Sequence, residues 1–180
     1  MRLHSPRLAR AVALATSTAL ASCSAWVMAA PADAATSVSC AMTINVHFFP
    51  ALHASSDNSG QFAGVGTADE CHGTLRGSPY TASGSVSEGG TRGPGRCGAD
   101  QGDGSIGVFL TDSTGARQRF IGNFHYVNTG LTIQVSGTTS EGFAIFGTFT
   151  IPFSAVAACS SSQGLESTTI TGTTNMNDRG

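Results

Sequence analysis

The chain has 180 residues, of which 23 are glycine, 11% are charged and none is lysine. This length suits one domain rather than two, and the composition is too apolar for a disordered chain. A formal net charge of −2 argues against a protein that binds nucleic acid by neutralising phosphates. We therefore expect no nucleic-acid partner.

The first 34 residues are typical of a secretory signal peptide. Three arginines open the chain, residues 11–30 are apolar or small, and Ala32-Asp33-Ala34 is the small-x-small pattern that signal peptidase reads. The sequence predicts cleavage after Ala34, secretion to the bacterial envelope or medium, and no membrane span in the mature chain. The rival interpretation is a membrane anchor, because the apolar run is nearly long enough to cross a bilayer; Pro31 and the cleavage pattern favour a removed signal.

A cysteine inside the signal segment leaves a second alternative open. Leu20-Ala21-Ser22-Cys23 resembles a bacterial lipobox, in which the cysteine is acylated and anchors the protein to a membrane. The residues after Cys23 remain apolar, whereas a lipoprotein tether is usually polar, which favours an ordinary signal peptide. The absence of lysine resembles the composition of actinobacterial proteins, since arginine codons are rich in G and C.

Four further cysteines indicate two disulfides. Cys40, Cys71, Cys97 and Cys159 form an even set in an exported chain. No two of them are close enough for a C-x-x-C metal site. Four cysteines allow three pairings, so the choice depends on how the strands pair.

Residues 38–48 form the clearest predicted strand. Six alternate positions from Val38 to Phe48 are apolar or thiol, while the positions between them are mostly polar. A second strand is predicted over 61–71, after a polar loop. If residue 49 lies opposite residue 62 in this hairpin, Cys40 lies opposite Cys71. We therefore prefer the pairing Cys40–Cys71 with Cys97–Cys159.

The rest of the chain also reads as strands, and Gly- and Asn-rich turns join the middle four as an antiparallel meander. The expected strands are 80–86, 105–111, 118–127, 131–136 and 143–151, with weaker ones at 153–158 (ambiguous because it is Ala-rich) and 165–171. The prediction is an all-β single domain over 35–171, either an antiparallel β-sandwich or a closed β-barrel of about 8–9 short strands. Residues 172–180 are expected to form a flexible C-terminal tail.

Glycines recur beside aromatic residues within these strands, as in Phe62-x-Gly64-x-Gly66 and Phe120-x-Gly122-x-Phe124. A strand glycine leaves a gap that a neighbouring ring covers, or it permits a bend in the sheet. The alternative is a ligand that lies close to the backbone inside a barrel.

The segment 88–104 is predicted to be a long glycine-rich loop and is the candidate binding loop. Arg92 and Arg96 could hold an anion or the carboxylate of a partner. Asp100 and Asp103 suggest calcium only faintly, because calcium prefers six to eight oxygens.

No motif assigns a catalytic residue, a metal or a cofactor. Residues 93–98 match G-x-G-x-x-G by letter, but a dinucleotide site needs a βαβ unit around that motif. The histidines of the mature chain lack zinc-site spacing, and no G-x-S-x-G elbow is present.

Three functions therefore remain. The first is a secreted, non-catalytic binding or interaction protein that presents loops on a disulfide-stabilised β scaffold to an unknown protein partner. The second is a carrier that holds a small apolar ligand in a barrel or sandwich cleft. The third is a small extracellular enzyme using scattered histidine and aspartate. A carrier should contain an apolar cavity, and an enzyme should bring a histidine and a carboxylate together in a cleft.

Overall fold

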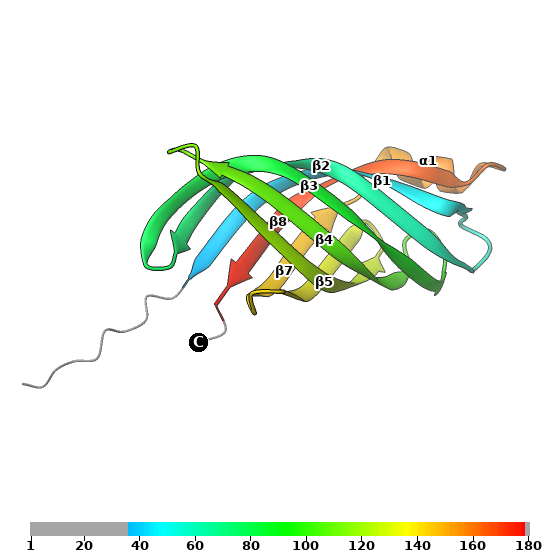
Figure 1. The fold of residues 1–180 in the computed structure, drawn as a ribbon. Coiled ribbons are helices and arrows are strands. Elements are labelled where there is room, and N and C mark those ends of the chain that lie inside the picture. The colour runs from blue at the N-terminus through cyan, green and yellow to red at the C-terminus, as the bar shows by residue number, and fades with distance from the viewer. Residues whose placement is uncertain (1–35, 179–180) are drawn as a thin grey trace, which may run out of the picture. The chain divides into compact units, whose positions relative to one another are not determined.

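The computed structural model describes residues 36–178 (Figure 1). The predicted signal peptide, the cleavage after Ala34 and the acylation of Cys23 lie outside these residues. Strands and one short helix follow one another along the described chain: β1 (Ser37–Leu52), β2 (Asn58–Leu75), β3 (Ser78–Gly95), β4 (Gln101–Asp112), β5 (Arg117–Thr129), β6 (Thr132–Thr139), β7 (Ala144–Thr150), α1 (Phe153–Cys159) and β8 (Leu165–Asn177).

The eight strands form a closed antiparallel barrel. Each strand pairs with the next along the chain, and β8 returns to pair with β1. The expected meander of the middle strands is confirmed and extends around the whole sheet. Closure leaves no sheet edge exposed, and it decides for the barrel over the sandwich.

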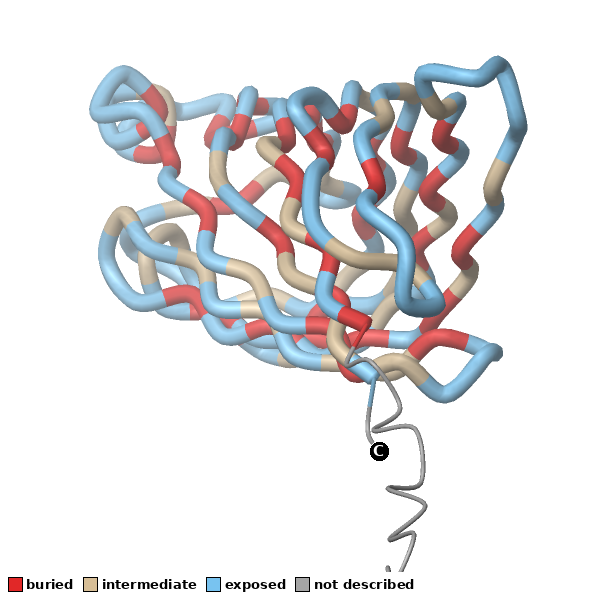
Figure 2. Tube along the Cα trace, turned by 90° about the vertical axis from the view of Figure 1, so that its left-hand side faces the viewer, coloured by how far each residue is buried: buried red, intermediate tan, exposed pale blue. Residues whose placement is uncertain are grey.

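The period-two pattern of each strand places one set of side chains inside the barrel. In β1, Val38, Cys40, Met42, Ile44 and Val46 are all buried, and the residues between them are exposed or half-buried. Figure 2 shows the same alternation of buried and exposed positions along the other strands. An eight-stranded barrel is just wide enough for such side chains to fill its interior.

The β1–β2 hairpin has a bulge that the sequence did not reveal. Phe49 lies opposite Gln61 rather than residue 62, so the predicted register is wrong by one along most of β1. Glu70, with φ of 50°, is an extra residue in β2 that shifts the register between Ser39 and Ala41. Beyond the bulge the predicted register applies again, which brings Cys40 beside Cys71.

Both preferred disulfides are confirmed. Cys40 is bonded to Cys71, and Cys97 is bonded to Cys159. The first joins neighbouring strands, and the second joins the β3–β4 turn to the last residue of α1.

The expected C-terminal tail over 172–180 was wrong for the described part. β8 continues to Asn177 and pairs with β1 on one side and with β7 on the other. The inward residues here are Gly172, Thr174 and Met176, so the apolar alternation that identifies a strand is weak.

The weak strand expected at 153–158 is instead the helix α1. Pro152 occupies the N-cap position, and the following residues are rich in alanine, which has the highest helix propensity. Ala155 and Cys159, four positions apart and so on one face, are its buried residues.

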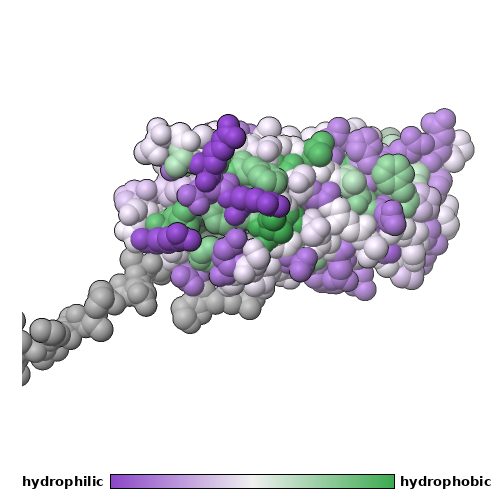
Figure 3. Space-filling model, viewed as in Figure 1, coloured by the Kyte–Doolittle hydropathy of each residue, from purple (hydrophilic) through white to green (hydrophobic). Residues whose placement is uncertain are grey.

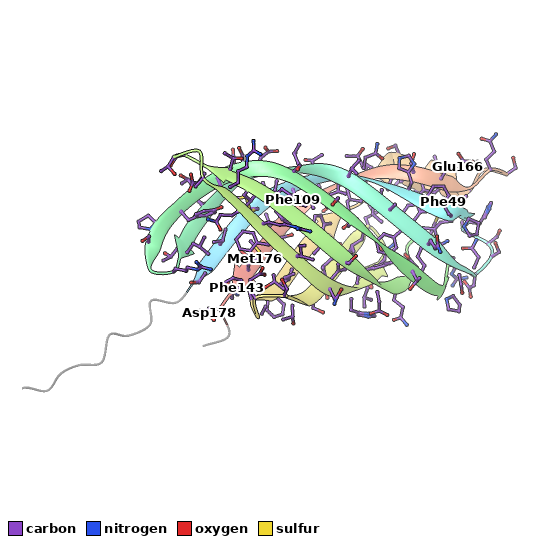
Figure 4. The ribbon with its side chains drawn as sticks, in the orientation of Figure 1. Phe49, Phe109, Phe143, Glu166, Met176 and Asp178 are labelled. Atoms are coloured by element: carbon purple, nitrogen blue, oxygen red, sulfur yellow. A yellow bond between two sulfur atoms is a disulfide. The ribbon has the colours of Figure 1, made fainter. Side chains whose placement is uncertain are left out.

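The two ends of the barrel differ. β1 begins and β8 ends at one end, where the Asp178 amide donates to the Thr36 carbonyl at 2.7 Å. The helix α1 lies at the other end (Figure 1). Figure 4 accordingly places Phe49 and Glu166 near α1, and Met176 and Asp178 at the opposite end.

Candidate functional site

Loops and the helix close the α1 end of the barrel and tie it together. The Cys97–Cys159 disulfide joins the β3–β4 turn to α1. The Cys97 amide donates to the His53 carbonyl at 3.1 Å, and the Ala54 amide donates to the Cys159 carbonyl at 3.1 Å. The β1–β2 loop, the β3–β4 turn and α1 thus form one linked cap.

Beneath this cap lies a cavity of about 370 Å³. Its apolar lining comes from β1, β6, the ends of β7 and β8, and α1, and includes Leu52, Leu131, Ile133, Ile151, Val156 and Leu165. Val156 lines the cavity and is also 41% exposed, so the cavity opens to solvent beside α1.

A cluster of three buried polar side chains forms one wall of the cavity. The Tyr126 hydroxyl donates to Asp100 Oδ2 at 2.7 Å, and Asn128 Nδ2 donates to Asp100 Oδ1 at 2.8 Å. Burial, and then the negative charge of Asp100, raise the pKa of Tyr126. The oxygen of the Asn128 amide is buried and has no hydrogen-bond partner among the described residues.

Arg92 lies beside this wall and holds neighbouring strands together. It is 3% exposed, and its guanidinium donates to the Pro50 carbonyl at 2.9 Å and to Asn58 Oδ1 at 3.1 Å. The same guanidinium lies 5.9 Å from the centre of the Phe48 ring. Arg92 therefore links β3 to the end of β1 and the start of β2.

A second, smaller cavity of about 40 Å³ lies deeper in the barrel. Phe48, Tyr126 and Ile133 line both cavities, so the two adjoin. Apart from Glu88 and Tyr126, the residues that line the inner cavity are apolar. Its volume suits one water molecule or one small polar group of a ligand.

Glu88 is on the inward face of β3, two positions after the buried Val86. Its Cγ and Oε1 lie over Gly64, where a Cβ would come within 2.9 Å of both atoms. The side chain is half-buried, and because it points inward, the surface it keeps faces the cavity. Among residues 36–178 the carboxyl makes no hydrogen bond or ion pair, and burial raises its pKa to about 7.

The candidate binding loop over 88–104 is not a loop. β3 continues to Gly95 and β4 begins at Gln101, which leaves only residues 96–100 between them. Several of the glycines that indicated a loop, such as Gly90 and Gly102, instead lie in strands where the neighbouring backbone leaves no room for a Cβ. A Cβ on Gly104 would lie 2.8 Å from Phe124 Cζ and 2.9 Å from Phe62 Cζ, so two rings cover this glycine, whereas Glu88 and Ile44 lie over Gly64 and Ile145 lies over Gly122.

The four residues expected on that loop are therefore separated. Arg92 and Asp100 are buried, whereas Arg96 is exposed on the turn and Asp103 is exposed on the outer face of β4. Among residues 36–178, no group of three or more His, Cys, Asp and Glu side chains is arranged to hold a metal ion.

One histidine does meet a carboxylate. His125 Nδ1 lies 3.0 Å from Asp103 Oδ1, in a shallow groove on the outer wall. The two side chains are 45% and 80% exposed, so water screens their interaction. The strands around the pair are hydrogen-bonded on both sides, which commits their N–H groups to the sheet instead of an oxyanion site.

The outer surface carries scattered apolar side chains. Figure 3 shows a small hydrophobic patch crossed by hydrophilic groups on the face formed by β3, β4 and β5. Here the Arg119 guanidinium lies 5.4 Å from the centre of the exposed Phe109 ring, so this ring already has an intramolecular partner. No helix within residues 36–178 is long and apolar enough to cross a membrane, and the two disulfides are compatible with secretion.

Sequence reasoning missed Glu88, Tyr126 and Asn128 as members of one site. A signal for Glu88 was available, because it shares the inward parity of Tyr80, Ala82 and Val86 in β3. A charged residue on an apolar parity is unusual. It was overlooked because the predicted strand ended at residue 86.

The comparisons with known proteins add no assignment to this geometry. No protein-family description, curated protein or solved structure matches this chain.

Proposed function

We propose that this chain is a secreted binding protein for a small, mainly apolar molecule, held in the cavity at the α1 end of the barrel. The observation that carries the proposal is the 370 Å³ apolar cavity, which lies within the range of about 300–1,000 Å³ typical of small-molecule sites. Burying the apolar part of a ligand favours binding by roughly 25 cal/mol for each Å² of surface removed from water.

The other two candidate functions have less support. The interaction hypothesis depended on a long loop over 88–104, and that segment is mostly strand. The enzyme hypothesis has only the exposed pair Asp103–His125 on the outer wall. The carrier hypothesis has a covered apolar cavity, which is the feature expected of it.

A neutral fluorescent probe, N-phenyl-1-naphthylamine, tests the proposal on the oxidised protein. We expect its fluorescence to rise on binding to the unmodified chain. Leu131→Trp enlarges a side chain that lines the cavity, so it should weaken probe binding at least tenfold. Val65→Trp is the matched control, since Val65 is 65% exposed and lies on β2 outside the cavity.

Probe binding that is absent, or that both tryptophan variants weaken equally, would contradict the proposal. Thermal melts of both variants establish that each is folded at the assay temperature.

A further inference from the structure

When Glu88 is ionised, the unpartnered polar groups that line the two adjoining cavities are acceptors. The Glu88 carboxyl borders the inner cavity and has no hydrogen-bond partner among the described residues. Asn128 borders the outer cavity, is 6% exposed, and leaves its amide oxygen unpartnered. A buried acceptor without a donor costs free energy, roughly 1–3 kcal/mol, so a ligand that brings a donor has an advantage here.

The donors of the same wall are already engaged. The Tyr126 hydroxyl and the Asn128 Nδ2 both donate to Asp100. Arg92 lines neither cavity. Its terminal nitrogens donate to the Pro50 carbonyl and to Asn58, and its buried Nε has no hydrogen-bond partner among the described residues. A ligand that could only accept hydrogen bonds would find few free donors.

The ionisable carboxyl groups that line the cavities also favour a positively charged ligand. Two carboxyl groups, Glu88 and Asp100, border the cavities, and no lysine, arginine or histidine does so among residues 36–178. The charged groups that act on the pKa of Tyr126 in β5 are Asp100 on the β3–β4 turn, and Arg92 and Glu88 on β3. The other strands packed around the inner cavity present apolar residues, such as Val46, Val135 and Ile170.

We propose that the ligand is an apolar amine, whose protonated nitrogen donates a hydrogen bond to the Glu88 carboxylate while its apolar body fills the cavity under α1. This inference rests on the proposed function. The inner cavity has room for a single ammonium group, and an ammonium–carboxylate pair is among the stronger hydrogen bonds. An apolar ligand without a donor would leave the Glu88 carboxyl without a hydrogen-bond partner.

Binding of an ammonium should depend on pH through Glu88. Without ligand, burial holds the pKa of this carboxyl at about 7, so much of it is protonated at pH 6. An alkylammonium, like the lysine side chain with a pKa of about 10.4, is charged at both pH 6 and pH 8. The pair then forms with release of one proton from Glu88 to solvent, and affinity rises as the pH rises through 7.

Three eight-carbon probes separate this inference from the proposed function. Octylamine, 1-octanol and octanoate are each used to displace N-phenyl-1-naphthylamine from the oxidised protein at pH 6 and pH 8. We expect octylamine to bind at least tenfold more tightly than 1-octanol at pH 8, to lose several-fold of that advantage at pH 6, and octanoate to bind most weakly.

The variant Glu88→Gln should abolish the tenfold preference for octylamine and leave the affinity for 1-octanol within about twofold. Glu141→Gln is the matched control, because Glu141 is exposed on the β6–β7 turn away from both cavities. Should Glu88→Gln fail to fold, Glu88→Asp keeps the charge but withdraws it by one methylene, and should reduce the preference.

Equal binding of octylamine and 1-octanol, or a preference that survives Glu88→Gln, would overturn the amine inference and leave the proposed function standing. Failure of 1-octanol and N-phenyl-1-naphthylamine to bind at all would instead overturn the proposed function.

Discussion

Glu88 is an ionisable side chain in the largely apolar interior of the barrel, and burial there destabilises its charged form. Burial raises its pKa from 4.5 to about 7. Between these values the folded state binds a proton that the unfolded state has lost. The contribution of Glu88 to the free energy of unfolding is therefore greatest below about pH 4.5, and it falls as the pH rises to 7.

The first prediction concerns the pH dependence that Glu88 contributes. Each pKa unit corresponds to 1.36 kcal/mol, so the loss amounts to at most about 3 kcal/mol above pH 7. Glu88→Gln removes the charge, so this variant should be more stable than the unmodified protein at pH 8 by about 1–3 kcal/mol and similar to it at pH 5. Urea unfolding at both pH values measures the difference, and Glu141→Gln serves as the control. Equal stability of the two proteins at pH 8 would contradict the prediction.

Gly104 carries a second prediction at the residue scale. A Cβ at this position would lie 2.9 Å from the Gly89 carbonyl oxygen and as close to the tips of Phe62 and Phe124. Gly104→Ala should therefore destabilise the barrel by about 1–3 kcal/mol, because close-packed rings must move.

Gly107→Ala on the same strand is the control for Gly104→Ala. Its nearest neighbour is the ring of Phe109 at 3.2 Å, and that ring is 42% exposed and free to shift. Thermal or urea unfolding should show little change for Gly107→Ala, and equal losses in the two variants would contradict the ring-packing explanation.

At the scale of elements, α1 and the β3–β4 turn together define the mouth of the cavity. The disulfide Cys97–Cys159 holds them, and both cysteines line the cavity. Replacing both with alanine should lower the free energy of unfolding by about 2–5 kcal/mol, since it removes a cross-link over 62 residues. It should also weaken binding of N-phenyl-1-naphthylamine, because the cap is no longer tied.

The pair Cys40–Cys71 supplies the matched comparison. It joins β1 to β2 near the start of β1, and neither cysteine lines the cavity. Replacing both with alanine should also lower stability but leave probe binding nearly unchanged. A similar loss of binding in both double variants would show that the Cys97–Cys159 cap does not define the site.

At the scale of the whole molecule, the predicted export gives a mass that can be measured. Protein secreted by a bacterial host should begin at Ala35 and be lighter than its reduced form by the four hydrogens that two disulfides remove. Native mass spectrometry without reductant tests both points, and a bound mass that disappears on denaturation would identify a ligand by weight. An acylated chain beginning at Cys23 would contradict the cleavage prediction.

The predictability of the fold differed among its parts. Strong period-two alternation located the strands β1 and β5. The turn glycines located the hairpins between β4 and β7, and Gly115 and Gly130 have the positive φ that was expected. The predicted strands stopped too early where the inward positions are glycine, threonine or a charged residue, as in the second half of β3 and at the end of β8. Such positions carry no apolar signal, although closure of the barrel buries them all the same.

The sequence by itself determined the all-β class, the presence of two disulfides and the turns between the middle strands, because alternation, the number of cysteines and glycine chemistry are local properties of the chain. Only the tertiary structure decided that the sheet closes, that Glu70 forms a bulge, and that 153–159 is a helix covering one end. The site belongs to this second group. Glu88, Asp100, Tyr126 and Asn128 come from β3, the β3–β4 turn and β5, and they share one cavity because strand pairing and inward parity bring together side chains far apart in the sequence.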